Sequence, residues 1–379
     1  MIIGVPKETK DQERRVGMIP AGVAALVGDG HRVLVGRDAG VGSGHTNDAY
    51  VASGAELVDN PGALFVQADL LVKVKEPQPP EFSLPRPGLI IFSFLSLGAN
   101  PATAEALCEN GVTAIGYETV QLPDGSLPLL KLMSAVTGRL AVEVGAHYLS
   151  SPQGGSGTLL SGVPGAPSAH VVVLGAGTAG GNAAEVALGM GARVTVISRG
   201  EERLQQLKSR LPSVETATST HGSIANAAKT ADVLIGVIRV PSGASPKLVT
   251  REMVRSMRPG SVIVDACIDQ GGCVETSRHT THSDPVYVEE GVTHYCVPNM
   301  PGAVPRTATE ALCGATFPYI QRITKLGVTQ ALRQDPALAL GLNTAGGHMV
   351  NQAVAQALGR PWVTAEEALA ELIERQQPA

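Results

Sequence analysis

Residues 170–199 read HVVVLGAGTAGGNAAEVALGMGARVTVISR, and the rest of the chain is interpreted around them. An apolar strand at 171–174 leads into the spacing G-x-G-x-x-G, a helix to about Met190, and a second strand at 193–197. Strand, glycine turn and helix in this order are the context that a dinucleotide-binding motif requires. The alternative is a glycine-rich turn that binds nothing.

The three glycines of this motif have separate tasks. Gly175 permits the tight turn, Gly177 lets the backbone approach a pyrophosphate, and Gly180 lets helix and strand pack closely. The first helical residues, Thr178 and Ala179, offer unpaired N–H groups and the positive end of the helix dipole to phosphates. We therefore expect these five residues to contact a dinucleotide.

The composition limits the classes of function. With 379 residues, of which 44% are hydrophobic, the chain is long enough for two or three domains with buried cores. A net charge of −5 disfavours nucleic acid or an anionic membrane as partner, and 3% aromatic residues disfavours stacking on bases. The longest apolar run, 89–97, is too short to cross a bilayer.

Cysteine and histidine usage disfavours a disulfide framework and a metal site. The five cysteines are odd in number and include no C-x-x-C pair, and MIIGVPKETK lacks the apolar region of a signal peptide. The expected compartment is therefore the cytoplasm. His279 and His282 have a metal-ligand spacing but no clear third ligand, so we expect no metal.

Residues 1–130 alternate short apolar strands with helical patterns, which predicts a parallel sheet with helices on its faces. We expect strands at 2–5, 32–36, 70–74, 89–94 and 112–117, and helices at 21–28, 48–53 and 102–110. Ligands of such sheets bind beyond the carboxyl ends of the strands. Polar residues follow the strands there, at Arg14, Arg15, Lys75, Glu76, Ser96, Tyr117 and Glu118.

A long helix at 131–150 and a glycine-rich connection at 153–168 indicate a domain boundary. Beyond the central motif we expect helices at 201–211 and 250–257, with Thr250 as N-cap, and strands at 232–238, 261–266 and 295–297. Helical patterns return at 305–327, and the tail 336–374 is predicted to be largely helical. The fold class is therefore α/β.

Several motifs resemble the alanine dehydrogenase family, which is related to the nucleotide-binding part of proton-pumping transhydrogenase. They are MIIGVPKETKDQERRVGMIPAGV, VKVKEPQ, GYETVQLPDGSLPLL, DQGGCVET and NMPGAVPRTAT, and their order is kept from Met1 to about Gly359. The resemblance implies two doubly wound Rossmann-like domains, a substrate domain of residues 1–132 and 306–379 and a nucleotide domain of residues 133–305. It also implies a homo-oligomer, commonly a hexamer. It also implies reversible oxidative deamination of L-alanine to pyruvate and ammonia with a nicotinamide cofactor.

Three residues match positions to which the family gives a chemical role. Arg15 matches the arginine that binds the substrate carboxylate, a task suited to a bidentate guanidinium; the alternative is a solvated arginine in a charged loop. Lys75 matches the lysine at the carbonyl or amine end of the substrate, where it would polarise C=O, and is otherwise a surface residue. Asp269 matches the aspartate that manages protons, and the alternative is a turn-forming residue before two glycines.

Further positions are expected at the site by the same resemblance. Tyr117, Met133 and Asn299 match substrate-side positions of the family. The alternative for Met133 is a place in the hydrophobic core. The remaining candidate cofactor contacts are Ser134, Val237, Ile238, Val297, Asn299 and Met300.

One departure from the family lies at residues 94–97, FLSL, where the family pattern resembles Y-L-H-L. Ser96 thus replaces a catalytic histidine, and a hydroxyl cannot take up a proton near neutral pH as imidazole does. Three interpretations follow. The enzyme keeps alanine and relies on Lys75, Asp269 and water, with Ser96 as a hydrogen-bonding substitute; it acts on another 2-oxo acid or imine; or it binds nucleotide without turnover.

A second departure concerns the choice of cofactor. The acidic residue about 20 positions after the glycines normally binds the adenosine ribose 2′-hydroxyl. Here Ser198 and Arg199 occupy that place, and Arg203 follows one helical turn later. The lost carboxylate removes repulsion against a 2′-phosphate, which serine and arginine can bind. NADP(H) is therefore favoured, with NAD(H) as the alternative; Glu201 and Glu202 weaken the argument but fit a helix start.

Overall fold

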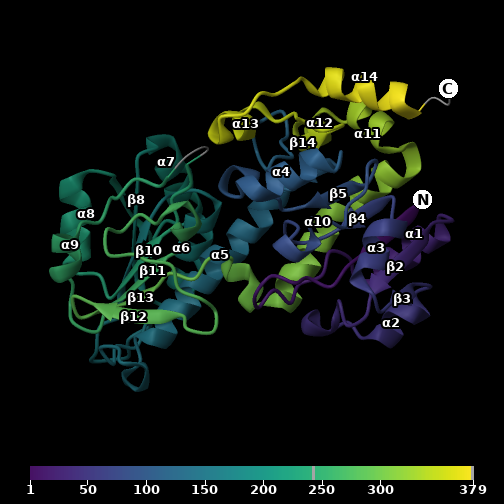
Figure 1. The fold of residues 1–379 in the computed structure, drawn as a ribbon. Helices are drawn as coiled ribbons and strands as arrows, with labels where there is room; N and C mark the ends of the chain where they lie inside the picture. Colours follow the sequence, from purple (N-terminus) through teal and green to yellow (C-terminus); the bar gives the residue numbers. More distant parts are fainter. Residues whose placement is uncertain (241–243, 377–379) are drawn as a thin grey trace. The chain divides into compact units, whose positions relative to one another are not determined.

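The computed structural model describes residues 1–240 and 244–376, with side chains through residue 370 (Figure 1). The chain divides into two compact units. The terminal unit comprises Met1–Leu132 and Val304–Ala379, and the central unit comprises Met133–Ala303. The boundary between 132 and 133 falls within the helix α5 (Pro128–Tyr148).

The terminal unit is built on one mixed sheet with the strand order β15-β14-β6-β5-β4-β1-β2-β3. Neighbours among β1 to β6 pair parallel, whereas β14 joins β6 antiparallel. The strands are β1 (Ile2–Val5), β2 (Arg32–Gly36), β3 (Glu56–Val58), β4 (Leu70–Val72), β5 (Ile90–Ser93), β6 (Thr113–Gly116), β14 (Leu342–Ala345) and β15 (His348–Met349).

Helices cover this sheet with apolar side chains. Leu64 and Phe65 from α3, Leu107 from α4 and Ala355 from α13 share one buried cluster with Leu71 and Ile91 of the strands. The helices of the unit are α1 (Pro20–Gly28), α2 (Asn47–Ala52), α3 (Pro61–Gln67), α4 (Pro101–Glu109), α10 (Pro305–Leu326), α11 (Val328–Gln334), α12 (Pro336–Leu340), α13 (Gln352–Leu358) and α14 (Ala365–Gln376).

The prediction of a largely helical tail is wrong where β14 and β15 form an antiparallel hairpin. Gly346 and Gly347 make its two-residue turn with φ of 60° and 98°, the conformation that tight hairpins favour and that glycine adopts readily. The alanine- and leucine-rich flanks suggested helix, but Asn343 and Thr344 are fully buried and Thr344 pairs with Ala114 of β6. The sheet is consequently mixed rather than wholly parallel.

The central unit contains a second mixed sheet with the order β12-β13-β11-β10-β7-β8-β9. All its neighbouring strands pair parallel except β12 and β13. The elements are β7 (His170–Leu174), β8 (Arg193–Ser198), β9 (Glu215–Thr218), β10 (Val233–Gly236), β11 (Val262–Asp265), β12 (Val286–Glu289), β13 (Val292–Tyr295), α6 (Thr178–Gly189), α7 (Glu201–Arg210), α8 (His221–Ala228) and α9 (Arg251–Arg255). Both units are thus Rossmann-like, and the predicted α/β class is confirmed.

Two local predictions in this unit had different outcomes. Thr250 is the N-cap of α9, since its side chain accepts the Met253 N–H at 3.3 Å. The strand predicted at 295–297 is misplaced, because β13 spans Val292–Tyr295 and follows β12 after a turn at Glu290 and Gly291. The residues that follow β13 are apolar and buried but do not pair in the sheet. Their apolar sequence was therefore mistaken for a strand.

Candidate active site

The glycine turn lies where the strand order of the central unit reverses, with β10 on one side of β7 and β8 on the other. Gly175 has φ of 117°, which favours glycine. A Cβ on Gly180 would lie 1.7 Å from the Gly175 carbonyl oxygen, whereas one on Gly177 would meet no described atom within 4 Å. The turn is therefore closed on its inner side and open at Gly177, as a bound pyrophosphate requires.

The helix α6 begins immediately after this turn, so Thr178 and Ala179 present first-turn N–H groups. The helix α5, which carries Ser134, packs closely against that first turn. A Cβ on Gly138 would lie 2.0 Å from the Ala179 carbonyl oxygen. Sequence analysis missed Gly138, because a glycine within a helical pattern does not reveal what it packs against.

The side chains at the end of β8 are free to meet a phosphate. Ser198 is the last residue of β8 and is half-buried, while Arg199 and Arg203 are exposed. Neither arginine forms an ion pair with another described residue. Glu201 and Glu202 occupy the first turn of α7, where they favour the helix dipole.

Residues after β10 and β13 supply the other predicted nucleotide contacts. Val237 donates its N–H to Leu174 at 3.0 Å, and Ile238 donates to the Cys267 sulfur at 2.9 Å. Val297 and Met300 are buried, and Asn299 adopts a left-handed φ of 55°.

The segment that carries Asp269 is shaped by a buried carboxylate. Asp265 ends β11 and accepts the N–H groups of Cys267, Cys273 and Val274 at 2.9 to 3.2 Å. Asp269 itself is exposed in the short 3-10 helix Ile268–Gln270. Asp265 is thus buried and occupied by backbone N–H groups, whereas the Asp269 carboxylate is exposed.

The two histidines with metal-ligand spacing have different surroundings. His282 Nε2 lies 3.3 Å from the Asn299 carbonyl oxygen, and His279 is exposed. Ligand-type side chains gather instead at Asp265, Cys267 and Cys273, where the carboxylate already accepts backbone N–H groups.

In the terminal unit, Arg15 is buried and paired. Its Nε and Nη2 atoms donate to the two Glu13 carboxylate oxygens at 2.7 and 2.5 Å, and its backbone N–H donates to the same group at 3.0 Å. Arg14 next to it is exposed. Arg15 is therefore not the solvated arginine of the alternative interpretation, and Glu13 fixes one edge of its guanidinium.

Lys75 follows β4 and lies in a strongly charged environment. Its Nζ is 3.6 Å from a Glu76 oxygen, and Lys10 donates to the other Glu76 oxygen at 2.6 Å. Burial alone would raise the pKa of Glu76, but the two lysines outweigh it and lower that pKa. Lys73, two residues earlier, is instead fully buried between Glu8 and Glu81.

The backbone of Ser96 has a left-handed conformation and is fixed by a hydrogen bond. Its φ is 48°, and its N–H donates to Glu118 at 2.5 Å, a carboxylate that also accepts the Leu95 N–H at 3.2 Å. Burial raises the pKa of Glu118. The half-buried Ser96 side chain therefore starts from a tightly constrained turn.

Tyr117 is fully buried, with its ring edge-on to Phe92 and Phe94 at centroid distances of 4.4 and 5.1 Å. Its hydroxyl has no hydrogen-bond partner among the described residues, and burial raises its pKa. Such a buried, unpartnered hydroxyl is suited to a ligand or water. Met133 is also buried, so its core role and its predicted substrate role remain compatible.

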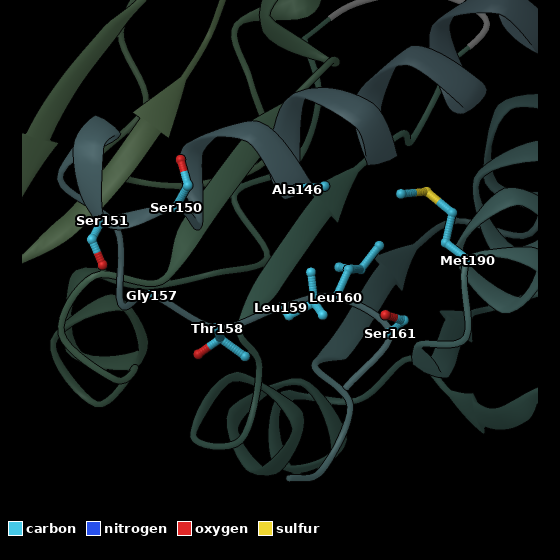
Figure 2. Close-up of a pocket in the computed structure, with 9 residues that line it drawn as sticks. All are labelled: Ala146, Ser150, Ser151, Gly157, Thr158, Leu159, Leu160, Ser161 and Met190. Carbon is cyan, nitrogen blue, oxygen red and sulfur yellow. The ribbon is translucent and has the colours of Figure 1, made fainter. Parts of the chain in front are cut away.

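A separate hollow of about 310 Å³ lies in the central unit and contains none of the predicted site residues (Figure 2). Its lining is formed by Ala146, Ser150, Ser151, Gly157, Thr158, Leu159, Leu160, Ser161 and Met190.

The predicted residues thus fall into two sets, one in each unit. The central unit is a dinucleotide-binding Rossmann fold with its glycine turn at the strand-order reversal. The terminal unit places the buried Arg15 in the loop after β1 and Lys75 in the loop after β4. Together these features define the class of nucleotide-dependent enzymes with two Rossmann-like units.

Comparison with known proteins makes the assignment narrower. The family models for the alanine dehydrogenase/PNT N-terminal and C-terminal domains match residues 4–137 and 141–352. The chain therefore belongs to the alanine dehydrogenase/PNT family, which confirms the resemblance inferred from its motifs.

Individual relatives agree over nearly the whole length. Alanine dehydrogenase of Bacillus subtilis is 50% identical over 97% of this chain and 98% of its own, and that of Methanococcus maripaludis is 48% identical over 98% and 100%. A solved L-alanine dehydrogenase matches with a TM-score of 0.91 at 46% identity, covering 95% of this chain and 99% of its own. A transhydrogenase from Sinorhizobium meliloti, 24% identical with a TM-score of 0.79 over 93% of this chain and all of its own, shares the fold.

Among the described residues, no helix combines the length and apolar character needed to span a membrane.

Proposed function

We propose that the chain is an NADP(H)-preferring amino-acid dehydrogenase that interconverts L-alanine with pyruvate and ammonia. The observation that carries the proposal is the match with alanine dehydrogenases over nearly the full length, combined with the open glycine turn. The terminal unit is proposed to bind the substrate, and the central unit the nucleotide.

The proposed reaction assigns one task to each polar residue. Arg15 binds the substrate carboxylate, and the Lys75 ammonium donates a hydrogen bond to the carbonyl oxygen, where negative charge develops. Asp269 accepts and returns protons as ammonia adds and the carbinolamine loses water. When bound, the reduced nicotinamide supplies hydride to the iminium carbon. Tyr117, Met133 and Asn299 complete the substrate contacts in this proposal.

The preference for NADP(H) is proposed from Ser198, Arg199 and Arg203. Two exposed guanidinium groups without an ion-pair partner among the described residues, beside a strand end that lacks the usual carboxylate, support binding of a 2′-phosphate. The remaining proposed nucleotide contacts are Ser134, Gly175, Gly177, Thr178, Ala179, Gly180, Val237, Ile238, Val297, Asn299 and Met300.

A second candidate function rests on Ser96. A hydroxyl in place of the family's imidazole leaves volume and removes a proton reservoir, which supports a larger 2-oxo acid or an imine as substrate. Both candidates share the nucleotide and the roles of Arg15 and Lys75.

A substrate panel separates the two candidates. Initial rates are measured with ammonia and pyruvate, glyoxylate or larger 2-oxo acids, for the native chain and Ser96→His. If alanine is the substrate, pyruvate gives the highest kcat/KM and Ser96→His raises it. If a larger 2-oxo acid is preferred and Ser96→His lowers its turnover, the second candidate holds.

We further propose that the chain is cytoplasmic and forms a homo-oligomer. The family resemblance implies an assembly of six subunits. All five cysteines are free thiols, which supports a reducing compartment. Light scattering on the purified protein tests the assembly, with six times the 39.0 kDa chain mass expected.

A further inference from the structure

The terminal unit contains a buried ion cluster that the proposed reaction does not use. Lys73 Nζ lies 3.2 Å from Glu8 Oε2 and 3.5 Å from Glu81 Oε1, and the three side chains are at most 5% exposed. Buried ion pairs stabilise a fold little or not at all relative to apolar residues of the same volume. Stability alone therefore does not account for three charged groups at this place.

The same carboxylates reach the backbone of the neighbouring loop. Glu8 Oε1 accepts the N–H of Val74 at 2.6 Å and that of Lys75 at 3.4 Å. Glu81 Oε2 accepts the N–H of Gln78 at 2.9 Å. The loop 74–78 is thus hydrogen-bonded near each end to a carboxylate, and both carboxylates pair with the Lys73 ammonium group.

The loop is fixed at two further points. Before it, the β4 backbone is pressed against Gly17, where a Cβ would lie 2.5 Å from the Val72 carbonyl oxygen. Within it, the Gln78 amide donates to the Glu76 carbonyl oxygen at 2.9 Å. Few conformations remain for the backbone from which Lys75 projects.

We propose that Glu8, Lys73 and Glu81 are positioning residues that fix the place of the Lys75 ammonium, an inference that rests on the role proposed above for Lys75. Charged hydrogen bonds from a carboxylate to backbone N–H groups are strong and directional. Placement matters because a displacement of about 1 Å at a reacting group lowers rates roughly 100-fold.

The charges of the cluster are consistent with this task. Burial would lower the pKa of Lys73, but Glu8 and Glu81 outweigh it and raise that pKa, so the ammonium keeps its proton. Two carboxylates face one ammonium, and burial raises the pKa of Glu8. Glu8→Asp keeps the carboxylate charge but is one methylene too short to reach both Lys73 and the loop N–H groups.

Asp335 offers a matched control in the same unit. It too accepts two backbone N–H groups, those of Ala337 and Leu338 at 3.0 and 3.1 Å, and pairs with one cation, Arg322. The segment it holds carries no proposed site residue. Asp335→Ala is therefore expected to lower the melting temperature without changing kcat.

The test compares kcat, KM and melting temperature of Glu8→Ala, Glu8→Asp and Asp335→Ala in the full chain. We expect Glu8→Ala and the shorter Glu8→Asp to lower kcat roughly 100-fold at unchanged KM for NADPH, and Asp335→Ala to keep the native kcat. The contrast between Glu8→Asp and Asp335→Ala decides between positioning and stability even if Glu8→Ala does not fold.

If Glu8→Asp keeps the native kcat, or if Asp335→Ala lowers kcat as far as Glu8→Asp does, the positioning role is overturned. Lys75→Ala separates this failure from that of the proposed function. Lost turnover in Lys75→Ala with full turnover in Glu8→Asp rejects the positioning role alone, whereas full turnover in Lys75→Ala rejects the role of Lys75 and the inference with it.

Discussion

The two units prepare their candidate sites by different physical means. In the central unit the decisive contacts are made by backbone, with Gly180 against the Gly175 carbonyl and Gly138 against Ala179. In the terminal unit they are made by buried ions, with Arg15 on Glu13 and Lys73 between two glutamates.

This difference tells us which substitutions each unit tolerates. A backbone cradle is disturbed by added atoms but not by added charge at its rim, so its nucleotide preference can change through exposed side chains such as Ser198 and Arg199. An ion cluster is disturbed by the loss of one partner, which leaves a charge buried without compensation. The following predictions test this contrast.

The largest effect is expected in the terminal unit from Arg15→Ala. Removal of the guanidinium breaks its buried ion pair with Glu13, which lowers the free energy of unfolding by about 3–5 kcal/mol. Arg14→Ala is the control, since Arg14 is exposed. Urea unfolding measures both, and equal stability of the two variants would contradict the prediction.

The next effect is steric and lies in the central unit. Gly180→Ala places a methyl group 1.7 Å from a carbonyl oxygen that cannot move away, so we expect a loss of about 3 kcal/mol and of nucleotide binding. Gly177→Ala should unfold like the native chain but bind NADPH roughly tenfold more weakly. Calorimetric titration and thermal unfolding check the pair; a destabilised Gly177→Ala would show that the turn is closed there too.

A smaller effect is expected from charge at the rim of the cradle. Ser198→Asp places a carboxylate at the end of β8, so kcat/KM for NADPH relative to NADH should fall roughly tenfold, or about 1.4 kcal/mol. Stability should stay as it is, because the site is half-buried and no partner is lost. An unchanged ratio in steady-state kinetics would place the 2′-phosphate elsewhere.

The smallest effect concerns pH. Burial lowers the pKa of His170 and His294 in the central unit below the usual 6.5, so the stability they contribute is present above about pH 6.5 and is lost as the pH falls through the folded pKa. Glu8 in the terminal unit has the opposite sign, because burial raises its pKa above 4.5 and its contribution is lost as the pH rises. As the pH falls from about 7 to 5.5, the hydrogen-exchange protection factors, which correct for the intrinsic pH dependence of exchange, should decrease in β7 and β13 more than in β1 and β4. An equal decrease in both units would remove the distinction.

The elements that the sequence predicts correctly are those with a distinct local pattern of apolar and turn residues. The strands Ile2–Val5 and Arg32–Gly36 have the predicted bounds, because each is a buried apolar run between turn residues. The β14–β15 hairpin was missed although Gly346-Gly347 is a hairpin signal, since buried polar residues in short strands lack an apolar alternation.

The site was predictable in its chemistry but not in its support. Arg15 and Lys75 could be selected by their resemblance to family positions. Their partners Glu13 and Glu8 lie in a charged stretch of sequence, which predicts solvent exposure rather than burial. Burial of those glutamates depends on tertiary packing that no local pattern reports. Lys73 carried a signal, since it stands between two valines in VKVKE at the end of a buried strand.

The most direct test of the proposed activity is the amount of L-alanine formed per nucleotide oxidised when pyruvate and ammonia are added to the purified chain. The account predicts one L-alanine for each NADPH oxidised, with a higher kcat/KM for NADPH than for NADH. Absence of L-alanine with either nucleotide, at concentrations where binding of that nucleotide is demonstrated, would contradict it.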